Sequence, residues 1–244
     1  MTDPIKGFFY LFRGLGLIFK PGLRRFVFLP LLLNSLLFGF GTWYGFGWYE
    51  LYIGQFTEWL PSWLRWLEWL LLPLFFIGAA VIVFFLFALV ANLIAAPFNG
   101  LLAERVEGHL MGRGLEGGPG GGVLKRLVPA IWNELSKWLY FLRWAILLLI
   151  ITLIPVVNVA APIFWMLFTA WMFTVEYADY PLGNHNLSGK QVRRRLGTSR
   201  MMSLGFGFAV MLATLIPGVN FLAMPAAVAG ATAMWVDRFS KVGE

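Results

Sequence analysis

Two long uncharged runs dominate the first half of the chain. Residues 26–49 carry no charged side chain over 24 positions, which suffices for one crossing, since a transmembrane helix needs about 20 apolar residues. Residues 69–103 are uncharged over 35 positions, more than a single crossing requires. We therefore predict two transmembrane helices, 26–49 and 69–103, the second continuing past the membrane as an extension interrupted at Pro97.

Two further uncharged blocks, 144–175 and 201–236, each contain a break centred on a proline. The sequence TLIPVVN at residues 152–158 is echoed by TLIPGVN at residues 214–220, so six of seven positions agree. Proline cannot sit unperturbed inside a helix, and each block should bend there. The arm before the first break, residues 144–154, would reach about 16 Å at about 1.5 Å per residue. That length is half of a hydrocarbon core of about 30 Å.

Positive charges give an independent indication of topology. Lys and Arg number five in residues 1–25, six in 104–143 and five in 176–200. Two crossings return the chain to its starting side by residue 104, so a full crossing by the third block would place 176–200 outside, against the positive-inside rule. Two half-penetrating (re-entrant) helical hairpins, 144–175 and 201–236, keep all basic segments together. Two kinked spanning helices are the alternative, because membrane helices tolerate proline.

The predicted fold class is an all-α integral membrane protein with two transmembrane helices, two half-penetrating helical hairpins and amphipathic interfacial helices in one membrane domain, 1–244. Turn backbone exposed to lipid is costly, so half-depth hairpins need shelter and we expect a homo-oligomer. The remaining segments are an amphipathic leader with an anion-site loop (1–25), an interfacial helix (50–68), a charged turn with a Gly-rich loop and an amphipathic helix (104–143), a basic loop (176–200) and a tail (237–244).

Composition supports a protein embedded in the lipid bilayer. Of 244 residues, 59% are hydrophobic and 13% charged, with a mean hydropathy of +0.75, whereas a soluble domain carries about a quarter charged residues. The net charge of +7 indicates a cytoplasmic-face bias rather than nucleic-acid binding, because no nucleic-acid-binding signature accompanies it. Cysteine is absent, which excludes disulfides and Cys-ligated metals. The start lacks a signal-peptide cleavage pattern, so 26–49 is interpreted as a retained span.

The candidate anion site consists of Gly22, Leu23, Arg24 and Arg25. Pro21-Gly22 predicts a turn just before the first long helix, which places both arginines beside backbone N–H groups that lack intrahelical partners. Cations there oppose the helix macrodipole. Two guanidinium groups, free amides and a flexible glycine suit a small dianion. On spacing alone, arginines that anchor the cytoplasmic end of a span are the more ordinary interpretation.

Other polar residues are candidates for a pore or a gate. After the second span comes a charged turn with Glu104, Arg105, Glu107 and His109. It is either a solvated, salt-bridged turn or a charged gate near a pore mouth, and its side chains do not converge as metal ligands would. The apolar runs contain three asparagines, Asn34, Asn92 and Asn99. These either form interhelical hydrogen bonds or line an anion path.

Glu176, Asp179 and His185 are the best candidates for a proton relay, which proton-coupled uptake would need. The alternative is a solvated loop in which they pair with the arginines at 193–195. Residues 112–117 match G-x-G-x-x-G, yet no strand precedes them, so they are interpreted as a flexible loop. With two histidines and no nucleophile elbow or Ser-His-Asp order, we expect no enzyme, no metal and no cofactor.

Several motifs together resemble the CysZ sulfate permeases of the bacterial inner membrane. The similarity runs from the leader to the end of the chain. The motifs are NLIAAPFNGLLAE (92–104), PGLRRF (21–26) followed by LPLLLN (29–34), EYADYP (176–181) with Asn184 and His185, and GATAMWVD (230–237).

The resemblance implies a multi-pass protein of the bacterial inner membrane that takes up sulfate for assimilation into cysteine, assembled as an oligomer with two transmembrane helices and two half-penetrating hairpins. In that family a Gly-Leu-Arg motif at the start of the first long helix holds sulfate. The matching residues are Gly22, Leu23 and Arg24, with Arg25 beside them. It also implies regulation by internal sulfur intermediates such as sulfite. Alternatives are a membrane scaffold or accessory protein that binds anionic lipid or other permeases, and a less selective anion channel.

Overall fold

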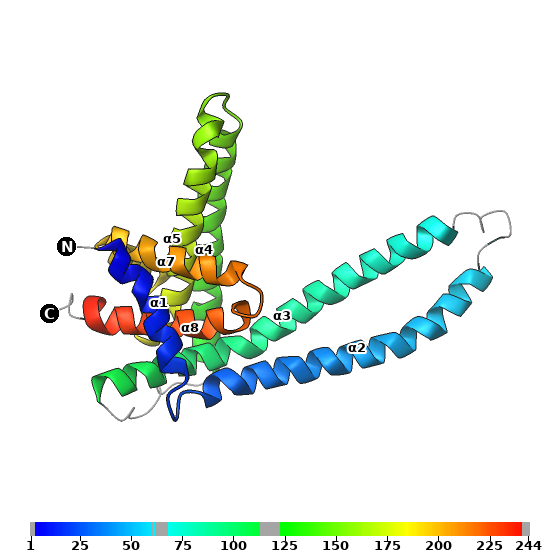
Figure 1. Cartoon of the computed structure of the whole chain (residues 1–244), viewed down its shortest axis with the longest axis horizontal. Coiled ribbons are helices and arrows are strands. Elements are labelled where there is room, and N and C mark those ends of the chain that lie inside the picture. Colours follow the sequence, from blue (N-terminus) through cyan, green and yellow to red (C-terminus); the bar gives the residue numbers. More distant parts are fainter. Residues whose placement is uncertain (1–2, 60, 62–67, 113–122, 241–244) are drawn as a thin grey trace. The chain divides into compact units, whose positions relative to one another are not determined.

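The computed structural model describes residues 3–59, 61, 68–112 and 123–240. Every regular element in this part of the chain is helical, which confirms the predicted all-α class (Figure 1). The elements in chain order are α1 (Pro4–Ile18), α2 (Arg25–Trp59), α3 (Glu68–Met111), α4 (Val123–Thr152), a 3-10 helix (Val157–Ala160), α5 (Ala161–Asn184), α6 (Gly189–Gly197), α7 (Arg200–Leu215), α8 (Asn220–Met234) and a π-helix (Trp235–Phe239).

Two compact units make up the fold, and their boundary falls inside α2 and α3. One unit comprises Met1–Val27 and Asn99–Glu244, and the other comprises Phe28–Phe98. The second unit therefore holds most of the two runs predicted to be transmembrane helices. The first unit holds the remaining helices, the first turn of α2 and the last turns of α3, where most of the candidate site residues lie.

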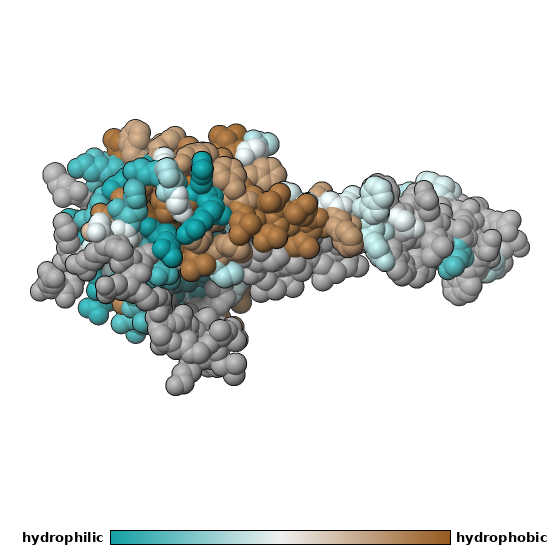
Figure 2. All heavy atoms as spheres, turned by 90° about the horizontal axis from the view of Figure 1, so that it is seen from below, coloured by the Kyte–Doolittle hydropathy of each residue, from teal (hydrophilic) through white to brown (hydrophobic). Residues whose placement is uncertain are grey.

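Length and composition identify the helices that fit a bilayer. Within the described residues, three segments are long and apolar enough to cross, or four if the bent pair α6–α7 counts as one: Arg25–Tyr44, Leu135–Thr152 and Val157–Asn184. The last two are the arms of the α4–α5 hairpin. Because α4 begins at Val123, the 11-residue arm predicted at 144–154 is part of a longer helix. Figure 2 shows that hydrophilic and exposed hydrophobic residues occupy separate regions of one face.

Several helices extend further than the sequence indicated. α2 continues to Trp59, into the segment expected to be interfacial, and α3 runs through Pro97 to Met111. The expected interruption at Pro97 is therefore absent from α3, because a helix in apolar surroundings keeps its remaining hydrogen bonds. The charged turn after 103 is the helical end of α3, and the basic segment 176–200 is mostly helical, in α5 and α6. Residues 113–122 of the Gly-rich loop lie outside the described residues.

α1 packs tightly on α7 and α8 (Figure 1). The Asp3 side chain caps it by accepting a hydrogen bond from the Ile5 amide at 2.9 Å, with proline at the first helical position, where its missing N–H is not needed. At four glycines an added Cβ would overlap the backbone of the facing helix: Gly7, Gly14, Gly205 and Gly230. The leader, predicted to be amphipathic, thus buries its small-residue face inside the protein and leaves Phe9 and Phe12 exposed.

The repeated TLIP motif folds in the same way in both hairpins. The Asn158 amide donates to the Ile154 carbonyl at 3.0 Å, and the Asn220 amide donates to the Ile216 carbonyl at 3.1 Å. The residue after each proline has a positive φ, +72° at Val156 and +85° at Gly218. Glycine adopts this conformation freely, whereas a β-branched residue is strained there. Both tips are mainly apolar, with one exposed asparagine each, and Val156 is 85% exposed.

The paired tips generate a reciprocal prediction. Gly218→Val should lower the free energy of unfolding by about 1–2 kcal/mol, because a side chain at positive φ approaches the following carbonyl. Val156→Gly should leave stability unchanged or raise it by up to about 1 kcal/mol, since strain is relieved while the unfolded chain gains freedom. Thermal unfolding in detergent measures both. Equal destabilisation by the two substitutions would contradict the strain at Val156.

The α1 contact generates a prediction with a control on the same helix. Gly14→Ala places a Cβ against the Ala226 carbonyl, so the helices must separate at a cost of about 1–3 kcal/mol. Gly16 has no atom within 4 Å of an added Cβ, so Gly16→Ala should stabilise α1 by about 0.5–1 kcal/mol. Thermal unfolding again reports the difference, and a stable Gly14→Ala variant would refute the close packing.

Candidate functional site

The candidate anion site lies in the turn that joins α1 to α2. Gly22 has φ +86°, and an added Cβ there would meet open space. The Leu23 and Arg24 amides donate to the Lys20 carbonyl at 3.1 and 3.3 Å. Leu23 is 4% exposed, whereas Arg24 and Arg25 are exposed. Leu23 therefore fixes the turn to the protein, and the two guanidinium groups face outward.

The amides of this turn are less available than the sequence indicated. In addition to those of Leu23 and Arg24, the Phe26 and Val27 amides are used, with the Leu23 and Arg24 carbonyls as acceptors at 3.0 and 3.1 Å. The expected cradle of uncapped amides is therefore mostly closed by the turn itself. The amides of Gly22 and Arg25 are not among these donors. An anion here depends chiefly on the arginine side chains.

The charges around this turn are predominantly positive. The Arg25 guanidinium lies over the Phe26 ring, 4.9 Å from its centroid. Neither Arg24 nor Arg25 forms an ion pair within the described part of the chain. Lys20 Nζ lies 3.2 Å from His109 Nε2, which brings the end of α3 to the turn.

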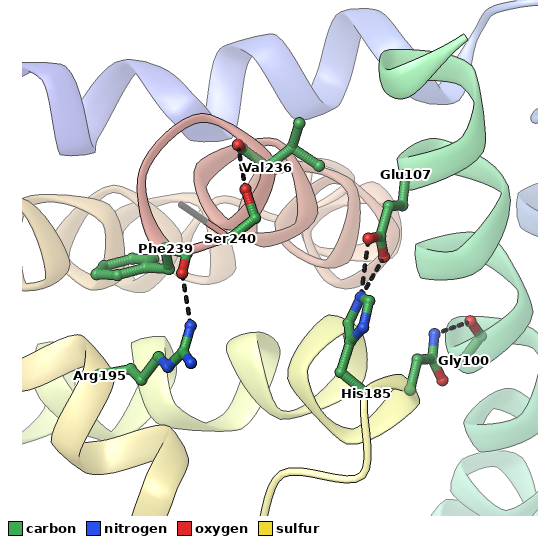
Figure 3. Close-up of polar contacts among 8 residues, drawn as sticks. Gly100, Glu107, His185, Arg195, Val236, Phe239 and Ser240 are labelled. Carbon is green, nitrogen blue, oxygen red and sulfur yellow. Dashed lines mark hydrogen bonds and ion pairs between the residues drawn. The ribbon is translucent and has the colours of Figure 1, made fainter. Parts of the chain in front are cut away.

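Glu107 and His185, expected separately as a gate residue and a relay residue, are in direct contact (Figure 3). His185 Nε2 lies 2.8 Å from Glu107 Oε1 and 3.0 Å from Oε2. The Glu107 side chain is 10% exposed. Its hydrogen bond raises the pKa of the His185 imidazole, while partial burial and the Arg195 charge act in the opposite direction. The imidazole also packs on the Trp235 ring at 5.2 Å between centroids.

The local sequence at the end of α5 positions this imidazole. The Asn186 amide donates to Gly183 and the Leu187 amide to Leu182, at 2.9 and 3.2 Å, the two hydrogen bonds of a Schellman motif. That motif needs a left-handed residue, and Asn186 has φ +58°, which asparagine tolerates better than most residues. His185 is the residue where the helix ends, so its side chain leaves α5 toward α3.

The other relay candidates lie on a different part of α5. Lys137 Nζ of α4 lies 2.7 Å from Glu176 Oε2 and 3.8 Å from Asp179 Oδ2. The three relay candidates are therefore divided between Lys137 and Glu107. Of the alternative partners, the arginines at 193–195, two are engaged elsewhere: Arg193 lies over the Tyr140 ring, and Arg195 donates to the Phe239 carbonyl at 2.6 Å (Figure 3). Lys137 was not singled out from the sequence, although it is the lysine facing α5 in a basic amphipathic segment.

The asparagines and the remaining charges have separate positions. Asn99 is 5% exposed, and its amide contacts Tyr180 Oη at 3.4 Å and Met224 Sδ at 3.2 Å. It thereby links α3 to α5 and α8. Asn34 is half-buried on α2, and its Oδ1 is buried without a partner among the described residues. The Asn92 side chain lies outside the described part of the structure. Glu104 is half-buried and Arg105 exposed on α3.

Comparison with known proteins identifies the family. Residues 10–225 match the family described as sulfate transporter CysZ/Etoposide-induced protein 2.4. The matched range includes the α1–α2 turn, the end of α3, both hairpin breaks and the Glu107–His185 contact. It covers most of the 244 residues. The chain therefore belongs to the sulfate transporter CysZ/Etoposide-induced protein 2.4 family, a family of membrane transporters.

Proposed function

We propose that this protein carries sulfate across the inner membrane of a bacterium for assimilation into cysteine, without enzymatic activity or a cofactor. The observation that carries the proposal is the pair of exposed arginines at the start of α2, beside the left-handed Gly22, in a chain of the sulfate transporter family. Gly22 and Leu23 shape the turn, and Arg24 and Arg25 bind the anion. Two guanidinium groups balance the charge of a tetrahedral dianion, and their forked N–H donors can hydrogen-bond to its oxygens.

Sulfate is costly to dehydrate, so a transport site must attract it and then release it. Exposed guanidinium groups act in a medium of high dielectric, where two unit charges 4 Å apart interact by about 1 kcal/mol. Such a site captures and releases its ion readily. The neighbouring Lys20–His109 contact at 3.2 Å keeps further positive charge near the turn.

The hairpin tips support the proposed insertion of α4–α5 and α7–α8 into the bilayer from one face, and the arms of α4–α5 are long enough to reach across it. Apart from Asn158 and Asn220, their exposed side chains are apolar, among them Leu153, Val156, Val159, Leu215, Ile216 and Phe221. Water would oppose this exposure, whereas a bilayer or a neighbouring subunit would favour it. The free backbone groups at the bends then need shelter from lipid, which an oligomer supplies. We propose a homo-oligomer with all basic segments on the cytoplasmic side.

Glu107 and His185 are the proposed control point of the ion path. Their contact joins the end of α3 to the junction of α5 and α6. Protonation of His185 strengthens the contact, and loss of the proton removes the charge that Glu107 faces. Glu104, Arg105 and His109 lie on the same stretch of α3. Glu176 and Asp179, paired with Lys137, are less suited to a relay with His185.

A less selective anion channel is the second candidate function. The exposure of Arg24 and Arg25 favours it, because a solvated site offers few shape-specific donors to distinguish one oxyanion from another. Competition of phosphate, chloride and sulfite with radiolabelled sulfate separates this candidate from a sulfate transporter. A scaffold or accessory protein would show no flux at all in liposomes that contain only this protein.

Neutralising the site arginines tests the proposal. In Arg24→Gln/Arg25→Gln, sulfate affinity should fall at least tenfold, because two charges that each attract the solvated dianion by about 1 kcal/mol or more are removed together. Calorimetric titration measures binding, and sulfate uptake into liposomes measures flux. Lys6→Gln/Arg143→Gln removes the same charge from exposed positions elsewhere and should retain both. Unchanged binding in the site variant would refute the assignment.

Stability at different pH values tests the Glu107–His185 contact. Because the folded-state pKa of His185 is raised, its contribution is fully present below the unfolded-state pKa of about 6.5. That contribution is lost as pH rises through the higher folded-state value. The melting temperature of the wild type should therefore exceed that of His185→Gln by more at pH 5.5 than at pH 9. His109→Gln, which removes the other histidine, serves as control and should keep the pH dependence. If the pH dependence of the melting temperature were the same in His185→Gln as in the wild type, the Glu107–His185 contact would not be the source of that dependence.

A further inference from the structure

α6 carries four cations and no acidic residue. The buried Val192 and Leu196 determine which face of this short helix packs against the protein. Two of its arginines are used internally, since Arg193 lies over Tyr140 at 4.4 Å and Arg195 donates to the Phe239 carbonyl. Lys190 and Arg194 are exposed, and because they are four residues apart they share a face.

Arg200, at the first position of α7, is also exposed. We call Lys190, Arg194 and Arg200 the α6 basic face. Within the described residues, none of the three forms an ion pair. Lys190 and Arg194 repel each other across one helical turn, and cations at the starts of α6 and α7 oppose the helix macrodipoles. The protein itself therefore leaves this positive charge uncompensated.

The bend after α6 indicates which kind of group neutralises the positive charge of the α6 basic face. The helix axis bends by 108° between α6 and α7. α7 then leads to the apolar tip at Leu215 and Ile216. If α7 enters the bilayer, as proposed above, α6 lies along the membrane surface at the level of the lipid headgroups. Phospholipid phosphates there are anionic acceptors in the plane of the helix. An acidic protein partner has no comparable reason to meet a helix at this depth.

We propose that the α6 basic face binds the headgroups of anionic phospholipids. Each lysine or arginine near an anionic surface strengthens membrane association about fivefold, and phosphate oxygens accept guanidinium hydrogen bonds in pairs. The inference rests on the proposed insertion of α7 but not on sulfate transport. Binding of these lipids holds α6 at the surface, and so fixes the start of the α7–α8 hairpin.

A cysteine-free chain allows a site-specific test. Thr198→Cys places a single thiol at an exposed position between α6 and α7, where a benzophenone maleimide can be attached. The labelled protein is reconstituted in nanodiscs with equal phosphatidylcholine and phosphatidylglycerol and then irradiated. Mass spectrometry of the cross-linked peptide should show at least a fivefold excess of phosphatidylglycerol, and this preference should decline with added salt.

Two double variants in the Thr198→Cys background decide the outcome. Lys190→Gln/Arg194→Gln should bring the lipid ratio close to one, while Lys6→Gln/Arg143→Gln should keep the excess. Equal labelling of both lipids by the wild type would overturn the proposal, as would labelling of an acidic protein instead of lipid in native membranes. Loss of the excess when phosphate replaces chloride at equal ionic strength would also overturn it, because the face would then be a soluble-anion site. Sulfate uptake is measured on the same variants reconstituted in liposomes, so failure of the transport proposal is recorded separately.

Discussion

The close approach of α1 to α7 and α8 is the constraint on which the first unit depends. Glycines at 7 and 14 on one side and at 205 and 230 on the other leave no room for a Cβ between the helix backbones. This contact fixes where α1 ends, and therefore where the chain must turn back into α2. The buried Leu23 then seats the turn. The outward direction of Arg24 and Arg25 is thus a consequence of packing among small residues some distance away.

A second constraint comes from polar contacts between segments far apart in sequence. Glu107 is nearly buried, and a buried carboxylate needs a partner, because an unpaired charge in that position costs several kcal/mol. His185 supplies the partner, and the Schellman motif at the end of α5 holds the imidazole in place. Glu176 plays the corresponding part for Lys137, whose side chain is 10% exposed. The hydrophobic runs set where helices form, and these few pairs set how the helices are joined.

The all-helical class could be predicted from the sequence, because charge-free stretches are local features, whereas the interruption expected at Pro97 does not occur in α3. The shared tip geometry at Asn158 and Asn220 follows from the repeat in the same way. The sequence could not show which hydrogen-bond donor pairs with which acceptor, or which charged side chains form ion pairs. The backbone amides beside Arg24 and Arg25 were expected to be free, but the Lys20 carbonyl accepts hydrogen bonds from the amides of Leu23 and Arg24. Such outcomes depend on tertiary contacts, and no periodicity in the sequence records them.

The exposure of the proposed sulfate site has a consequence for selectivity. A solvated pair of guanidinium groups attracts any small anion, and its Coulomb energy changes little between one oxyanion and another of equal charge. Discrimination therefore has to arise where the ion is dehydrated and the surrounding dipoles are fixed. The carboxylate of Glu107, nearly buried and paired with His185 near the end of α3, would repel a dianion, so this contact suits control of an ion path better than binding of the ion. Under the proposed function, capture at Arg24 and Arg25 and control near Glu107 would therefore be separate steps, and the Lys20–His109 contact brings the end of α3 to the turn.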